Sequence, residues 1–451
     1  MDLRTDKIST LFKKYFIPTL FGMLSMSAVT AIDGVFVGHG IGSDGIAAVN
    51  ICIPLLMIFT GIGLMAGIGS SVISSIYLSK GKIKTARLNV TQSILFSTLV
   101  ATIPSVFMMF FLEETAYFLG SSEYLLPMVK EYLIWFIPSL TFQMWLSVSL
   151  FIIRLDGAPK LAMWFNISAA LITTVLGGIF IFPLQMGLTG AALAPTLALL
   201  IGGSVSLYYL IYRAKILRLY PLKLGFRGFR LFIYSISEQC QIGFSALLGE
   251  ATMAVLMFVG NHIFLQYLGD NGVGAFGIAC YYMPFVFMIG NAIAQSAQPI
   301  ISYNYGLYQH DRVIGTEKLA LITAVICGGI VSFVFVVFPE VLVGLFLKTD
   351  NPAAGLAIKG FPYFAFGFIC FVLNLTVIGY FQSIEKPKPA AFFAFLRGFA
   401  FLIPAFILVP QVLGEEGIWL AMPISETLTT IACLIFFVIK NESRLVQKAY
   451  T

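Results

Sequence analysis

Two short segments of this chain recur at one fixed displacement, and this duplication is the feature that most constrains the fold. Residues 41–48 (IGSDGIAA) return at 268–275 (LGDNGVGA), and residues 187–194 (GLTGAALA) return at 414–421 (GEEGIWLA), in both cases 227 positions later. A third pair, at 159–160 and 387–388, is displaced by 228 positions. The three landmarks indicate two homologous halves that together cover nearly the whole chain.

The composition indicates that these halves lie in a membrane. Hydrophobic residues make up 59% of the chain and charged residues 11%, whereas charged residues are roughly a quarter of a soluble globular chain. The sequence therefore predicts an all-α polytopic membrane protein with twelve transmembrane helices, six in each half. The apolar runs of spanning length lie at 15–37, 49–77, 88–112, 132–153, 161–182, 188–211, 242–268, 273–301, 319–346, 361–381, 390–413 and 418–439.

The basic residues predict the topology, because Lys and Arg are retained in cytoplasmic loops. With the N-terminus inside, 23 of the 27 Lys and Arg fall in cytoplasmic segments, and both termini are then cytoplasmic. These loop cations, which can contact anionic lipid, account for the net charge of +6, so a nucleic-acid partner is not needed to explain it. We expect an N-lobe at 1–212, a basic cytoplasmic linker at 213–234 and a C-lobe at 235–451. Because each lobe has an even number of spans, a pseudo-two-fold axis along the membrane normal should relate them.

Ionisable residues inside spans are costly and mark candidate functional sites. Asp33 and Glu250 lie in the leading helix of each half. A carboxylate facing a partly dry cavity can change protonation near neutrality, as an antiporter requires. The alternative is a structural hydrogen bond, or for Asp33 a place close to the outer surface. For Arg397 and Glu426, at similar depths in adjacent spans, a structural ion pair is the preferred interpretation.

The eighth span carries a polar stripe on one helical face, formed by Asn291, Gln295, Gln298 and Ser302. In lipid such a face turns towards another helix or towards a water-filled cavity, and both interpretations stay open.

Several motifs resemble the multidrug and toxic compound extrusion (MATE) family of transporters. Residues 33–39 (DGVFVGH), which lead into the turn at 45–48, resemble the family's first helix and its end. Residues 154–160 (RLDGAPK) are similar to its loop between helices four and five, and residues 187–194 to its entry into helix six. Together these resemblances span the whole chain.

The resemblance implies two six-helix lobes around a central cleft, and export of amphipathic organic cations in exchange for protons or sodium. It implies that Asp33 and Glu250 are the cation-coupling residues of the two lobes, and that the first helix bends at Pro18. Met26, with Asn291, Gln295 and Gln298, is expected to line the substrate cavity. We also expect a monomer in a bacterial inner membrane, which binds small-molecule substrates, contacts lipid and requires no cofactor.

The chain also departs from the family pattern. An acid often found in helix five is replaced by Gly177, a threonine in helix six by Pro195, and the tenth span contains no acid. Sodium requires several oxygen ligands, so this loss favours proton coupling, although Thr173 and backbone carbonyls near Asp33 could still hold sodium.

Two alternative functions follow from the same spans. A flippase for lipid-linked glycans should place several Arg and Lys in its cavity. In this sequence Arg397 alone lies within an expected span, which argues against a flippase. A receptor without transport is the alternative from another class. No clustered catalytic motif indicates an enzyme, since the three histidines are scattered and no HExxH or GxSxG pattern occurs.

Overall fold

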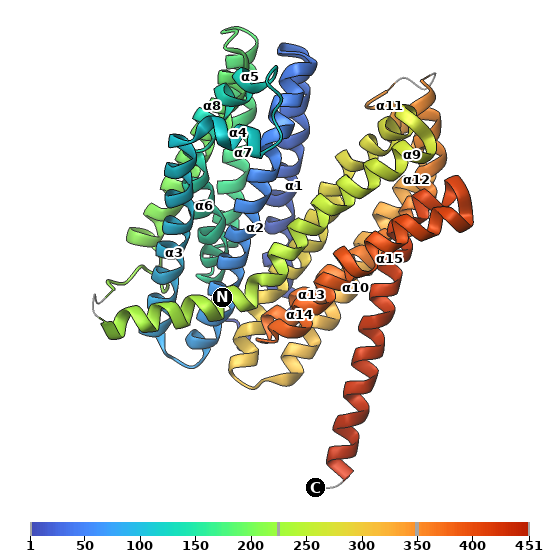
Figure 1. Ribbon diagram of the computed structural model, residues 1–451. Coiled ribbons are helices and arrows are strands. Elements are labelled where there is room, and N and C mark those ends of the chain that lie inside the picture. The colour runs from blue at the N-terminus through green and yellow to red at the C-terminus, as the bar shows by residue number, and fades with distance from the viewer. Residues whose placement is uncertain (1, 223–225, 348–350, 450–451) are drawn as a thin grey trace. The chain divides into compact units, whose positions relative to one another are not determined.

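The computed structural model describes residues 2–222, 226–347 and 351–449, and these residues form helices and short connections (Figure 1). Residues 223–225 of the expected linker lie outside the described residues. The first half contains α1 Ile8–Gly40, α2 Ser43–Ser79, α3 Ile83–Phe110, α4 Leu112–Phe118, α5 Leu126–Phe136, α6 Ser139–Leu155, α7 Pro159–Ile181, α8 Gly187–Tyr208 and the π-helix η1 Tyr209–Arg213. The second contains α9 Phe226–Gly306, α10 His310–Val337, α11 Pro339–Gly344, α12 Pro352–Ala365, α13 Phe368–Ser383, α14 Pro387–Phe395, the π-helix η2 Leu396–Ala400 and α15 Leu402–Ala449.

The described helices include nine that are long and apolar enough to cross a membrane, or eleven when each of two bent pairs counts as one span. The sequence predicts twelve. The difference arises in one segment of 53 residues, Pro387–Ile439, which contains both of the last two expected spans. This segment is interrupted at Gly414, whose φ of 62° and ψ of −139° are not helical. The all-α polytopic fold is thus confirmed.

The backbone conformation repeats together with the sequence. Eight of the ten described residues with positive φ form pairs at the displacement of the duplication: Gly42 (101°) with Gly269 (62°), Gly81 (71°) with Tyr308 (60°), Gly157 (86°) with Glu385 (53°), and Gly187 (57°) with Gly414 (62°). Glycine adopts this left-handed region without the steric cost that a Cβ atom imposes. The duplicated motifs therefore encode the breaks between consecutive spans in both halves.

A bend inside one span also recurs in both halves. The helices α5 and α6 meet at 48°, and α12 and α13 meet at 49°. The first pair contains the span expected at 132–153 and the second the span expected at 361–381, so corresponding spans share one shape.

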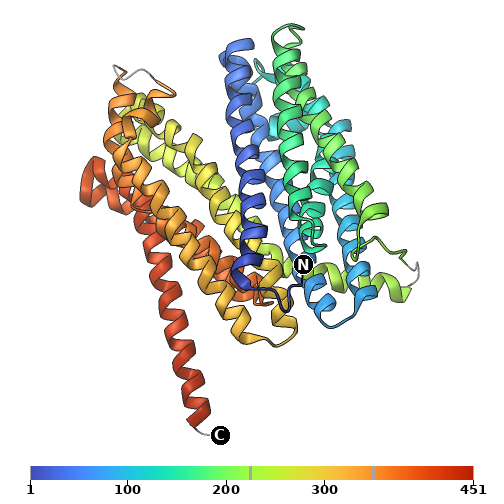
Figure 2. The same cartoon turned by 180° about the vertical axis from the view of Figure 1, so that it is seen from behind.

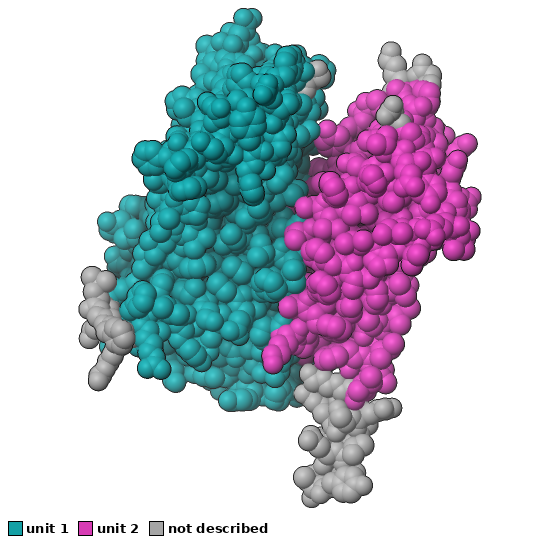
Figure 3. Space-filling view, in the orientation of Figure 1, with its two compact units in different colours: residues 1–250, 295–316, 382–387 teal, residues 251–294, 317–381, 388–451 magenta. Residues whose placement is uncertain are grey.

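The chain divides into two compact units, which are coloured separately in Figure 3. Unit 1 comprises residues 1–250, 295–316 and 382–387, and unit 2 comprises 251–294, 317–381 and 388–451. These units are not the two halves of the duplication, because the boundaries divide α9 and α10. The lobe boundaries expected from the sequence stay a prediction.

Within unit 1, helix α1 packs along α7, and α7 packs against α8; Figure 2 shows α1 in blue beside green helices. Small residues permit close approach: a methyl group on Gly22 would lie 3.3 Å from the Cα of Met163 on α7. Many large apolar side chains on the outside are exposed, among them Phe21 at 59% and Ile103 at 64%. Such a surface suits lipid rather than water.

Unit 2 is built around buried aromatic rings. Phe264 stacks on Phe276 with centroids 4.4 Å apart, and it meets the ring of Trp419 edge-on at 4.8 Å. Phe361 also contacts Trp419. These rings connect α9, α12 and α15 around one core.

Candidate ion-coupling and polar sites

Asp33 lies seven residues before the end of α1, on the side that faces α7 and α8. A methyl group on Gly177 would lie 4.0 Å from Asp33 Oδ1, 3.6 Å from the Phe36 ring and 3.8 Å from the Ala194 Cβ. The carboxylate is half-buried, and it forms no hydrogen bond or ion pair with the described residues. Gly177, which replaces the acid that the MATE resemblance leads us to expect in this helix, therefore lies next to Asp33.

The other predicted residues on α1 and α7 lie within continuous helix. Thr173 is buried on α7, one turn before Gly177, and its Oγ1 donates to the carbonyl of Ala169 at 3.0 Å. Helix α1 continues without a break through the buried Pro18, and Met26 is half-buried further along it. Among the described residues, no group of three or more His, Cys, Asp or Glu is placed to hold a metal ion.

Glu250 is buried on α9 and is the last residue of the first segment of unit 1. Its Oε1 has no hydrogen-bond partner among the described residues. The Cβ of Glu250 lies 3.6 Å from the place that a methyl group on Gly61 of α2 would take. Further along the same contact, methyl groups on Gly69 and Gly243 would collide with the facing backbone. Close packing of small residues therefore fixes Glu250 against α2.

The polar stripe divides into different environments. Asn291, in unit 2, is half-buried and donates to the Phe287 carbonyl of its own helix at 3.2 Å. Gln295, in unit 1, is buried, and its Oε1 accepts from Arg154 Nη1 at 2.5 Å. Gln298 is also buried, and its Nε2 has no acceptor among the described residues.

Arg397 and Glu426 form an ion pair in unit 2, with Arg397 Nε 2.6 Å from Glu426 Oε1 and both side chains almost fully buried. Asn374 donates to Glu426 Oε2 at 2.7 Å and to the Glu426 carbonyl at 2.9 Å. The guanidinium carbon of Arg397 lies 4.0 Å from the centroid of the Phe371 ring. Each charge is thus balanced by several contacts, as a buried pair requires.

The sequence interpretation missed three buried charged residues. Arg154, counted with the loop cations, is buried in the last turn of α6. Asp156 accepts from the Tyr209 hydroxyl and from three backbone amides at 215–217, so it fixes the start of the inter-lobe segment. Glu317 is buried on α10, and neither of its carboxylate oxygens has a partner among the described residues. Glu317 was missed because α10 begins nine residues before the apolar run that marks its span.

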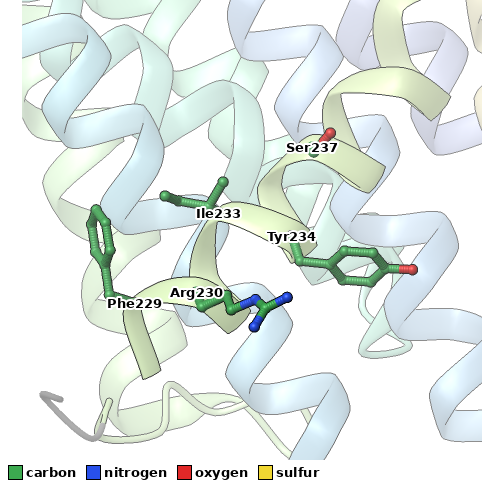
Figure 4. A pocket seen from close by; sticks show the side chains of 5 residues that line it. All are labelled: Phe229, Arg230, Ile233, Tyr234 and Ser237. Atoms are coloured by element: carbon green, nitrogen blue, oxygen red, sulfur yellow. The ribbon is translucent and has the colours of Figure 1, made fainter. Parts of the chain in front are cut away.

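A surface groove of about 460 Å³ lies along the first turns of α9 (Figure 4). Its lining comes from this helix alone: Phe229, Arg230, Ile233, Tyr234 and Ser237. Exposed aromatic and aliphatic side chains beside a cation are typical of a helix that lies at a membrane interface. The groove contains none of the predicted site residues.

A duplicated bundle of spanning helices with buried carboxylates is typical of a membrane transporter. The MatE family model matches residues 18–179 and 246–407, one copy in each half. This chain therefore belongs to the MATE family, whose members are transporters rather than enzymes, and the resemblance found in the sequence is confirmed.

Known relatives cover nearly the same length. The multidrug export protein MepA of Staphylococcus saprophyticus is 23% identical over 98% of this chain and 96% of its own. An FAD transporter of Shewanella oneidensis is 21% identical over 92% of this chain and 91% of its own. A solved outward-facing MATE family transporter of the MOP superfamily has a TM-score of 0.90, with 19% identity and coverage of 98% of this chain and 97% of that one.

Proposed function

We propose that this protein exports amphipathic organic cations in exchange for protons. The observation that carries the proposal is Asp33, a half-buried carboxylate in a membrane-spanning helix without a polar partner among the described residues. A carboxylate in that environment can take up or release a proton without breaking a structural contact. An ionisable group kept in a span at such a cost is a functional site by default.

Coupling requires two states that bind the proton with different affinity. In the outward-open state, water reaches Asp33 and the carboxylate takes a proton from outside. The neutral side chain tolerates a drier, rearranged α1, with Pro18 as the bend, and the loss of negative charge disfavours the bound cation. The cation therefore leaves as the proton enters. On the cytoplasmic side the proton is released, and a new cation restores the charged form.

Glu250 is proposed as the coupling residue of the second half. Support comes from its burial and from the unpartnered Oε1 of its carboxylate. Because α2 and α9 pack closely beside it, a change in the charge of Glu250 acts directly on the contact between these two helices.

The coupling ion is proposed to be a proton rather than sodium. Sodium takes several oxygen ligands, whereas a proton needs a single carboxylate. Gly177 contributes no oxygen from its side chain beside Asp33.

Drug-like cations are the proposed substrates, and the name of the MepA relative supports this class. Met26, Gln295 and Gln298 of unit 1, and separately Asn291 of unit 2, are proposed as cavity-lining residues, since a few polar groups among apolar ones are typical of small-molecule sites. The bacterial relatives support a bacterial plasma membrane location, and the distribution of Lys and Arg supports cytoplasmic termini. A glycan flippase is disfavoured because the described residues include two buried cations, Arg154 and Arg397, and Glu426 neutralises the second.

The test is transport by the purified protein in proteoliposomes under an imposed pH gradient with sodium absent. We expect a labelled organic cation to move against the proton flux, and Asp33→Asn to reach the membrane but lose this movement. Asp311→Asn, which changes an exposed acid at the start of α10, is the matched control and should transport normally. Wild-type export by Asp33→Asn between about pH 6 and 8 would contradict the proposal. Binding of the cation without any uptake would identify a receptor instead.

A further inference from the structure

Two buried arginines in this protein have unequal partners. Arg397 is paired with the carboxylate of Glu426. Arg154 is equally enclosed, with 4% of its surface exposed, but its one hydrogen-bond partner among the described residues is the neutral amide oxygen of Gln295. The Phe151 ring lies 5.3 Å from the Arg154 guanidinium carbon, and the Arg154 Nε has no acceptor among these residues.

No acid among the described residues forms an ion pair with Arg154. Asp156, two residues from Arg154, accepts hydrogen bonds at both carboxylate oxygens from Tyr209 and from backbone amides rather than from Arg154. The ion pairs among the described residues are Arg397 with Glu426 and the exposed Lys130 with Glu113, and Arg154 takes part in neither. A buried charge without an opposite charge destabilises the protein, so an anion bound beside Arg154 would offset this cost.

A second orphaned donor lies on the same helical face. Gln298 follows Gln295 by three residues on α9, which places both side chains on one side of the helix. Its Nε2 is buried and has no acceptor among the described residues. Arg154, which binds Gln295, and Gln298, one helical turn after Gln295, thus each keep a buried donor without an acceptor among the described residues, and all three residues belong to unit 1.

We propose that Arg154, Gln295 and Gln298 form an internal site for a small anion of one negative charge, either chloride or the carboxylate of a bound organic molecule. The guanidinium supplies the charge and an N–H at Nε, and Gln298 supplies a second donor. The duplication does not repeat this arginine, because the position related to Arg154 is the neutral Gln382, whose Nε2 donates to Ser245 at 2.8 Å. The carboxylate alternative rests on the proposed function, in which Gln295 and Gln298 line the substrate cavity, whereas the chloride alternative does not.

The first measurement is the apparent Tm of the full chain in detergent at constant ionic strength. Chloride and formate are compared with gluconate, an anion too large for an enclosed site. We expect a saturable rise in Tm with chloride and with formate, relative to gluconate. Equal Tm values in all three salts would overturn the proposal.

Variants test whether Arg154 carries the effect. Gln295→Glu places a built-in carboxylate against Arg154, so its Tm in gluconate should match or exceed the wild-type value in chloride, and its response to chloride should disappear. Gln298→Leu should keep the fold and weaken the response. The matched control is Gln382→Glu, which buries the same carboxylate without an arginine and should lower Tm in every salt. A full chloride response in Gln295→Glu would contradict the assignment.

Binding of radiolabelled chloride separates the two sources of the anion. Displacement by a zwitterionic compound, but not by its methyl ester, would assign the site to a carboxylate of the transported molecule. Saturable chloride binding that neither compound displaces would assign it to chloride itself. Absence of saturable chloride binding in the wild-type protein, together with no effect of formate on its Tm, would refute both.

Discussion

Arg397 and Glu426, 29 residues apart, meet in unit 2 as a buried ion pair with a nitrogen to oxygen distance of 2.6 Å. Arg397 lies in the π-helix η2, and Asn374 on α13 completes the contacts of Glu426. The pair joins three segments through charge inside an otherwise aromatic core.

We expect the loss of one partner to cost more than the loss of both. Glu426→Gln leaves Arg397 buried and uncompensated, which should destabilise the protein by about 3–5 kcal/mol. The double variant Arg397→Met with Glu426→Leu removes both charges and should recover most of this loss. Apparent Tm values in detergent measure the difference. Equal destabilisation by the single and double variants would show that charge is not the reason.

The second prediction compares Tyr308 with Gly81, two positions that the duplication relates. Tyr308 has a φ of 60° and is 75% exposed, whereas its counterpart Gly81 has a φ of 71° and open space where a Cβ would lie. Tyr308→Gly should stabilise by up to about 1 kcal/mol, and Gly81→Ala should destabilise by a similar amount. Opposite changes in Tm are the expected result. A loss of stability in both variants would indicate that the Tyr308 side chain matters more than its backbone.

The third prediction concerns Glu385, in the connection between α13 and α14. Partial desolvation by its surroundings raises the pKa of Glu385 above its ordinary value of 4.5, although the residue is exposed, and nearby Glu238 adds to this rise while Lys80 and Lys386 oppose it. The folded protein therefore holds this proton more tightly than the unfolded chain does, so Glu385 lowers stability as pH rises through its folded pKa. Glu385→Gln should raise Tm at about pH 8 and lose this advantage towards pH 5. A pH-independent gain in Tm would contradict the assignment.

The sequence predicts the duplicated architecture because the duplicated motifs are also the breaks between helices. Glycines at 42, 187, 269 and 414 all adopt positive φ, and this conformational requirement is visible in residue type alone. Apolar runs mark most spans for a similar reason, since lipid demands a continuous apolar surface. The family model confirms the resemblance that rests on these motifs.

Long-range partners could not be predicted in the same way. Arg154 and Gln295 are 141 residues apart, and nothing in a loop-charge count distinguishes an arginine that turns inwards from one that faces water. Asp156 likewise depends on backbone amides some 60 residues away. Hydropathy also places the start of a span at its apolar run, so the buried Glu317 in an earlier turn of α10 escaped notice.

The last prediction tests why Gly177 bears on the coupling ion. Gly177→Asp would introduce a second carboxylate beside Asp33, and two carboxylates supply the several oxygen ligands that sodium requires. We expect a sodium gradient to drive export by this variant but not by the wild-type protein. Gly178→Asp is the matched control: a Cβ there would lie 3.6 Å from the Phe36 ring, with Asp33 not among its neighbours. Transport in proteoliposomes with either gradient alone provides the measurement. If the wild-type protein already responds to sodium, or if both variants gain the response equally, then Gly177 does not determine ion choice through its position beside Asp33.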